Sequence, residues 1–195
     1  MHLIGTCPYL PSGWLTDVLP TEVVRRAQFR STGVEVPQSR CEILSVPADG
    51  DCLFTSLGVE FQRLLLIDAA IGREFLGSFV RTEFLLSVAK ADDDGLSMYD
   101  IPIRLIFEAA SGLNWCDYLS AMQGFAVRRN LTWGGFAEAL WLCEEKGVKL
   151  EIYEQDLDAF RLVCSSDDVG APHGAVTIVW TGSHYDVLTI TAAAR

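Results

Sequence analysis

A cysteine near the start of an apolar segment and a histidine–aspartate pair near the end of the chain have the residue types of a thiol-dependent catalytic centre. Cys52 follows the acidic turn Asp49–Asp51. A backbone that passes from a turn into a helix directs its first N–H groups and its dipole at this position, which favours the thiolate. His184 and Asp186 are two residues apart on a predicted strand, so their side chains leave the same face. The three residues suit a nucleophile, a base and the group that orients the base.

The alternative for Cys52 is a structural role. Free cysteines are among the most buried residue types, and a small apolar residue at the start of a helix needs no chemistry. The far end of the chain favours the catalytic interpretation, because Val176–Trp180 and His184–Ile190 read as two strands joined by a turn at Thr181–Ser183. This hairpin presents the histidine–aspartate pair.

Three motifs follow one another between about Cys41 and Ile190. They are Asp49-Gly50-Asp51-Cys52-Leu53-Phe54, then Thr132-Trp133-Gly134-Gly135 followed by Glu138, and finally His184-Tyr185-Asp186. Each motif alone is weak, but the order and spacing together are specific. In these motifs the sequence resembles the OTU (ovarian tumour) family of cysteine proteases, most of which are deubiquitinases. The sequence departs from the commonest form of the family motif at Thr55, where many members carry a basic residue.

The resemblance assigns roles to the residues around Cys52. Cys52 is the expected nucleophile, His184 the base and Asp186 its orienting partner, and Asp49 supports the loop or the charge distribution beside them. The backbone N–H groups of Gly50, Asp51 and Cys52 itself are the expected oxyanion donors, and such a donor is worth about 3 kcal/mol in other proteases.

The resemblance also implies a substrate. Ubiquitin ends in two glycines, and a channel formed by Trp133, Gly134 and Tyr185 would admit glycine but exclude larger side chains. The expected reaction is hydrolysis of the isopeptide bond at the carboxyl end of ubiquitin, polyubiquitin or a ubiquitin-like modifier. Two alternatives stay open: a catalytically silent module that binds ubiquitin, and a papain-like cysteine protease with another substrate.

Composition limits the partners and the cell compartment. The 195 residues suit one ordinary domain, and a net charge of −11 suits a basic protein partner better than nucleic acid or an anionic membrane. Simple solubility explains the charge equally well. With 3 histidines and no C-x-x-C pair, we expect no metal and no other cofactor. The sequence lacks a secretory signal and a long apolar run, so we expect a soluble protein of the cytoplasm, or of the host cytosol if its source is a pathogen.

Periodicity predicts an α+β, papain-like organisation with helices flanking a small, mostly antiparallel sheet, and the resemblance implies that this is the OTU fold. We expect residues 1–40 to form an arm packed on a domain of residues 41–195. The predicted helices are 52–71, ended by Gly72, then 73–92, two short helices around 102–107 and 115–122, and 134–146 capped by Thr132. The predicted strands are 41–46, a hairpin of 148–153 with 160–164, and the two strands of the C-terminal hairpin. His173 is expected in an exposed loop, and Asp92–Asp94 in a solvated loop rather than a calcium site.

Overall fold

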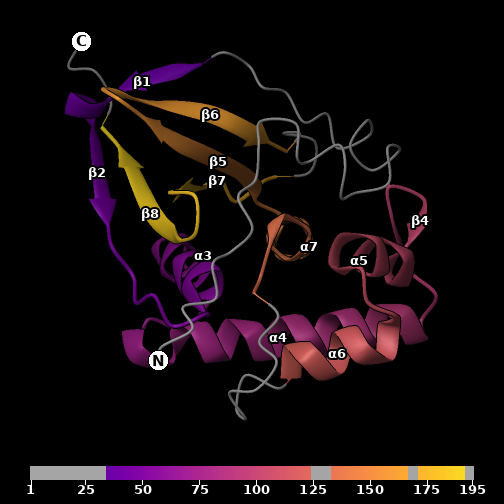
Figure 1. Cartoon of the computed structure of the whole chain (residues 1–195). Helices are drawn as coiled ribbons and strands as arrows, with labels where there is room; N and C mark the ends of the chain where they lie inside the picture. Colours follow the sequence, from indigo (N-terminus) through magenta and orange to yellow (C-terminus); the bar gives the residue numbers. More distant parts are fainter. Residues whose placement is uncertain (1–33, 124–132, 167–170, 192–195) are drawn as a thin grey trace, which may run out of the picture.

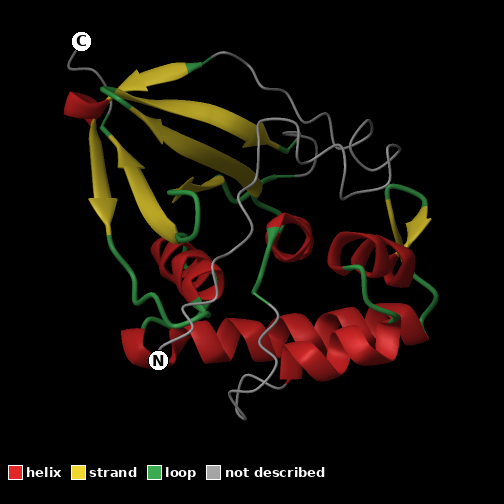
Figure 2. Ribbon diagram, in the orientation of Figure 1, coloured by secondary structure: helices red, strands yellow, loops and turns green. Residues whose placement is uncertain are grey.

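A layer of helices lies against one curled sheet (Figures 1 and 2). The computed structural model describes residues 34–123, 133–166 and 171–191. Its helices are α3 (Cys52–Arg63), α4 (Arg73–Asp93), α5 (Ile103–Ser111), α6 (Trp115–Gln123) and α7 (Phe136–Lys146). The predicted α+β class is confirmed. No helix in these described ranges is long and apolar enough to cross a membrane.

The sheet has six strands in the order β1-β6-β5-β7-β8-β2. Their bounds are β1 Glu35–Pro37, β2 Cys41–Leu44, β5 Lys149–Asp156, β6 Ala159–Ser165, β7 Ala175–Trp180 and β8 Tyr185–Ile190. Neighbouring strands are antiparallel except for β5 and β7. A separate two-stranded ladder joins β3 (Ser97–Met98) to β4 (Ile101–Pro102). The sheet is therefore mostly antiparallel, as its sequence pattern predicts.

The first and last strands of the sheet order are neighbours in the chain. Only the 3₁₀ turn Gln38–Arg40 separates β1 from β2, although they form opposite edges. The sheet must therefore curl until its edges approach at this end (Figure 1). A small apolar cluster fills the curl, consisting of Val36, Tyr153, Phe160, Leu162, Val179 and Leu188. Residues 1–33 of the predicted arm lie outside the described residues, so its packing stays a prediction.

The larger core lies between the helices and the sheet. Ring contacts run through it: the centroids of Phe54 and Phe84 are 5.9 Å apart, those of Phe84 and Phe107 are 5.4 Å apart, and Phe107 stacks on Tyr118 at 5.3 Å. This core holds α3 and α4 together, and both helices contribute to the candidate site.

The predicted helix 52–71 is too long, because α3 ends at Arg63. Leu66 N–H donates to the Phe61 carbonyl and Leu65 N–H to that of Gln62, which places Leu65 in the left-handed region with φ 59°. This is a C-terminal capping motif that glycine usually occupies. The apolar residues that follow continue the hydrophobic pattern without continuing the helix. The last predicted helix is displaced at its other end: α7 begins at Phe136, with Gly135 as N-cap, and the predicted cap Thr132 lies outside the described residues.

Candidate active site

Cys52 is the first residue of α3, and its side chain is buried. The turn before it needs glycine, since Gly50 has φ 92°, where a side chain would be strained. Asp49 Oδ1 accepts a hydrogen bond of 3.0 Å from Asp51 N–H and so closes the turn. Local backbone geometry thus brings the cysteine to a helix start, as the sequence predicts.

The electrostatic environment of Cys52 differs from the prediction. Burial raises the pKa of the Cys52 thiol, and the negative charges of Asp49 and Asp186 raise it further. Hydrogen bonds from the backbone of Tyr185 and Leu53 lower the same pKa but do not outweigh desolvation. The helix start therefore does not make this cysteine a thiolate by itself, because loss of hydration penalises the charged form more.

His184 lies in the turn that leads into β8, one residue before the strand begins. The turn is closed by Thr181 N–H, which donates to the His184 carbonyl at 3.0 Å. His184 Nε2 lies 3.1 Å from Asp186 Oδ1, so the predicted pair is in hydrogen-bonding contact. His184 Nδ1 is buried and has no hydrogen-bond partner among the described residues. The imidazole thus has one nitrogen beside a carboxylate and the other available for a proton.

Two contacts join the histidine strand to the cysteine helix. The Ser56 hydroxyl, on the first turns of α3, donates to the Tyr185 carbonyl at 3.2 Å. The backbone of Tyr185 also hydrogen-bonds to the Cys52 thiol, which is one of the causes that lower its pKa. The structure therefore brings the helix start that carries Cys52 next to the segment that carries His184 and Asp186, although the two are more than one hundred residues apart in the chain.

The expected oxyanion donors are not equivalent. Asp51 N–H is already donated to Asp49 Oδ1. This bond leaves Gly50 and Cys52 as the backbone donors of the predicted set that remain for a substrate oxygen. Cys52 stands at the first helical position, where N–H groups have no acceptor within the helix.

Gly134 and its neighbours lie against the same helix start. A Cβ on Gly134 would come within 2.7 Å of the Phe54 ring and 2.9 Å of Leu53, so the absence of a side chain permits this approach. The adjacent Trp133 is 38% exposed. Tyr185 is partly buried and packs on the main core. Each aromatic residue of the expected channel is thus close to α3: Trp133 precedes Gly134, which packs on α3, and the Tyr185 carbonyl accepts from Ser56 of α3.

A buried carboxyl group fixes the backbone beside Trp133. Glu138 Oε2 accepts from Gly135 N–H and Glu138 Oε1 from the Tyr118 hydroxyl, both at 2.8 Å. Burial raises the pKa of Glu138, and burial together with the nearby Glu138 charge raises that of Tyr118. These bonds tie the start of α7 to α6.

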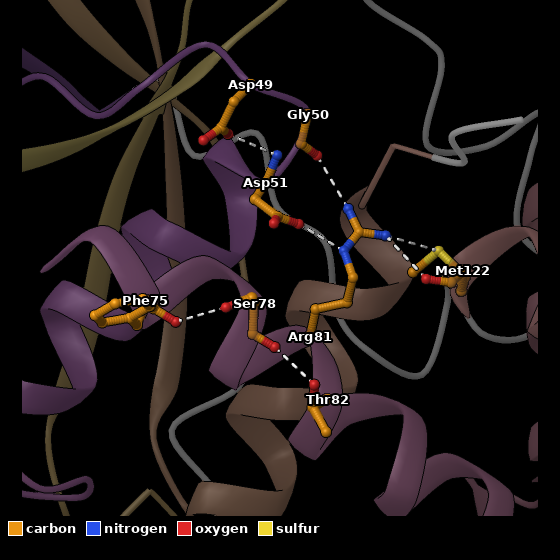
Figure 3. A network of polar contacts seen from close by, with 8 residues as sticks. All are labelled: Asp49, Gly50, Asp51, Phe75, Ser78, Arg81, Thr82 and Met122. Atoms are coloured by element: carbon orange, nitrogen blue, oxygen red, sulfur yellow. Dashed lines mark hydrogen bonds and ion pairs between the residues drawn. The ribbon is translucent and has the colours of Figure 1, made fainter. Parts of the chain in front are cut away.

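One residue of the site is absent from the sequence-based set. Arg81, on α4, is buried and forms an ion pair of 2.6 Å with Asp51 (Figure 3). It lies four residues after Gly77 and three before Phe84, so an arginine on the apolar face of the helix was the signal available in the sequence. A buried arginine requires an anionic or carbonyl partner, and here it has both kinds.

His173 is exposed, as predicted. The predicted solvated loop Asp92–Asp94 is wrong in part, because α4 continues to Asp93 and Asp92 pairs with Arg104 at 2.7 Å. Across the described ranges, no group of three or more His, Cys, Asp or Glu side chains is arranged to hold a metal ion.

No family model matches the sequence, and no curated protein matches it significantly. Solved structures do match the fold. The Hazara virus OTU bound to ubiquitin is 20% identical, with a TM-score of 0.57 over 87% of this chain and 99% of that chain. The viral OTU domain protease from Taggert virus is 17% identical, with a TM-score of 0.54 over 83% of this chain and 88% of that one. The OTU domain of OTUD1 is 12% identical, with a TM-score of 0.51 over 90% and 95%. The protein therefore has the OTU fold.

Proposed function

We propose that the protein is a cysteine deubiquitinase that hydrolyses the isopeptide bond at the carboxyl end of ubiquitin. The support is the arrangement of Cys52, His184 and Asp186 within an OTU fold, together with the likeness to a viral OTU that was solved bound to ubiquitin. Ubiquitin or polyubiquitin is the proposed partner, and the cytoplasm, or a host cytosol, the proposed location.

The observation that carries the proposal is the different surroundings of the two nitrogens of His184. Nε2 lies 3.1 Å from Asp186 Oδ1, where the carboxylate favours the tautomer with the proton on Nε2, while Nδ1 is buried without a partner among the described residues. A neutral imidazole in this tautomer accepts a proton at Nδ1 and is then stabilised by the carboxylate.

The reaction follows from this tautomer. Cys52 Sγ attacks the carbonyl carbon of the last ubiquitin glycine while His184 Nδ1 takes the thiol proton. The C–N bond breaks, the proton passes from Nδ1 to the lysine amine, and a thioester remains on Cys52. Water then attacks the thioester carbonyl carbon and gives a proton to the same nitrogen. The C–S bond breaks, ubiquitin leaves with a free carboxyl group, and Nδ1 returns the proton to the Cys52 sulfur. Because burial raises the pKa of the Cys52 thiol, the thiol needs His184 to take its proton for the attack.

The negative oxygen formed in each step requires hydrogen-bond donors that are already in place. We assign the Gly50 and Cys52 N–H groups to this role, since Asp51 N–H is bound to Asp49. Trp133, Gly134 and Tyr185 are assigned to the tail of the substrate, where glycine fits and a side chain does not.

The test is the hydrolysis of ubiquitin carrying a fluorophore in amide linkage at its carboxyl terminus. The parent should release the fluorophore, whereas Cys52→Ala and His184→Ala should lower kcat at least about a thousandfold. Cys116→Ala is a matched control, because Cys116 is an exposed cysteine on α6. If the parent leaves ubiquitin intact but cleaves a ubiquitin-like modifier, the proposed substrate is wrong. Turnover by Cys52→Ala would exclude Cys52 as the nucleophile.

A further inference from the structure

Arg81, on α4, contacts both the turn that precedes Cys52 and the end of α6 (Figure 3). Its Nε donates to Asp51 Oδ1 at 2.6 Å and its Nη2 to the Gly50 carbonyl at 3.0 Å. Its Nη1 lies 3.5 Å from the Met122 carbonyl and 3.6 Å from the Met122 sulfur. The planar guanidinium thus holds the turn on one side and the end of α6 on the other.

The same guanidinium also contacts the helix that carries Cys52. Its central carbon lies 4.5 Å from the centroid of the Phe54 ring, two residues after the cysteine. Arginine favours such a stacked position over an aromatic ring because its charge is delocalised and weakly hydrated. Arg81 therefore contacts both the turn and the first turn of α3.

The turn has little room to move away from this contact. A Cβ on Gly77, one helical turn before Arg81, would lie 2.7 Å from Asp51 Cβ and 2.4 Å from the Thr55 hydroxyl. The backbone of α4 therefore lies directly against Asp51. The side chains of Arg81 and Asp51 are only 5% and 6% exposed, so their ion pair is shielded from water. Packing against α4 thus sets the position of the turn, and the hydrogen bonds of Arg81 set its orientation.

We propose that Arg81 is a positioning residue, which fixes the Gly50–Asp51 turn so that the N–H groups of Gly50 and Cys52 face the substrate oxygen. It acts on the substrate oxygen indirectly, through Gly50 and Asp51. The inference rests on the proposed function, because it concerns the acyl-transfer step of the same site.

A purely stabilising ion pair would have different consequences. Replacing a buried ion pair with apolar residues is often neutral or stabilising, whereas removing one partner leaves the other charge unpaired. A double variant, Arg81→Met with Asp51→Leu, therefore separates stability from orientation. It removes both charges and both hydrogen bonds to the turn while keeping the site filled.

The experiment compares Arg81→Lys, Arg81→Met and the double variant with the parent, using the ubiquitin–fluorophore amide. We expect kcat to fall at least tenfold in the double variant and in Arg81→Lys, while KM stays within threefold of the parent value. Both variants should show a cooperative thermal unfolding transition, which shows that they are folded. Alkylation of Cys52 by iodoacetamide needs no oxyanion donor, so its rate should stay within twofold. Arg104→Met is the matched control. Arg104, on α5, is half exposed and pairs at 2.7 Å with Asp92, which lies about three helical turns after Arg81 on α4. It should keep the parent kcat.

Three results would overturn the inference. They are a folded double variant with the parent kcat, a fall of kcat matched by an equal fall in alkylation, and a change confined to KM. If Arg81→Met does not fold, the comparison of Arg81→Lys with the double variant decides the question. A parent inert towards ubiquitin would refute the proposed function alone. Acylation of Cys52 by p-nitrophenyl acetate then tests Arg81 separately, with the same tenfold loss expected.

Discussion

Asp186 and Val46 are joined by a buried hydrogen bond of 2.9 Å, in which the Val46 N–H donates to Asp186 Oδ1. The same oxygen lies 3.1 Å from His184 Nε2. Val46 follows β2 and leads into the turn before Cys52. One carboxylate oxygen thus orients the base and anchors the segment that delivers the nucleophile.

This shared oxygen predicts an order among variants. An asparagine oxygen can accept both bonds, so Asp186→Asn should lower kcat about tenfold to a hundredfold, less than the thousandfold or larger loss expected for His184→Ala. Asp186→Ala should lose more activity than Asp186→Asn and also about 1–3 kcal/mol of stability, because Val46 N–H loses its buried acceptor. Steady-state kinetics and urea unfolding measure both effects. An Asp186→Asn variant as inactive as His184→Ala would show that the negative charge itself is required.

The pH dependence of Cys52 alkylation tests its electrostatic environment. Because burial raises the pKa of Cys52, the rate should rise to a midpoint above that of an ordinary thiol, about 8.5. Asp49 contributes to the raised pKa through its charge, so Asp49→Asn should move the midpoint down by roughly a few tenths of a pH unit. Asp158→Asn, on the hairpin between β5 and β6, is the control and should leave it unchanged. A parent midpoint well below neutral pH would contradict this description.

Gly134 and Gly135 form a matched pair for testing the contact with α3. A Cβ on Gly134 meets Phe54 and Leu53 at less than 3 Å, whereas a Cβ on Gly135 meets only Glu138 Oε2, at 3.3 Å. Gly134→Ala should therefore destabilise the protein by about 1–3 kcal/mol and lower kcat, whereas Gly135→Ala should cost well under about 1 kcal/mol. Thermal unfolding of both variants is the measurement, and equal stability of the two would show that the close approach is unimportant.

Leu65 offers a stabilising substitution away from the site. It is 85% exposed and has φ 59°, so its side chain gains little from burial and strains the backbone. Leu65→Gly should raise the free energy of unfolding by about 0.5–1 kcal/mol. Leu157→Gly is the comparison, since Leu157 is 97% exposed without a positive φ, and it should not stabilise the protein. A destabilised Leu65→Gly would mean that Leu65 contributes through its side chain.

The sequence predicts the helices and strands with strong periodicity, because each buries one continuous face. The recurrence of Leu76, Val80, Phe84 and Val88 locates α4, and alternation locates the hairpin of β5 and β6. The nearness of His184 to Asp186 follows from their separation of two residues, although the predicted strand begins one residue late, at Tyr185, and His184 lies in the turn before it. These features depend on residues a few positions apart.

The features that the sequence does not predict depend on distant partners. β1 has three residues and forms because β6 provides an edge. The end of α3 depends on a capping motif that the apolar run Leu64–Ile67 conceals. The contacts of Arg81 can be predicted only if one knows that Gly50, Asp51 and Met122 all lie around its guanidinium group. The raised pKa of Cys52 likewise results from burial in the completed fold.

The most direct test of the proposed function is the mass of the intact protein after incubation with ubiquitin that carries a thiol-reactive group at its carboxyl terminus. The parent should gain the mass of one ubiquitin, and Cys52→Ala should gain none. That result would establish the nucleophile and the recognition of the ubiquitin tail together. A parent that is alkylated at Cys52 by iodoacetamide, but forms no ubiquitin adduct, would contradict the account.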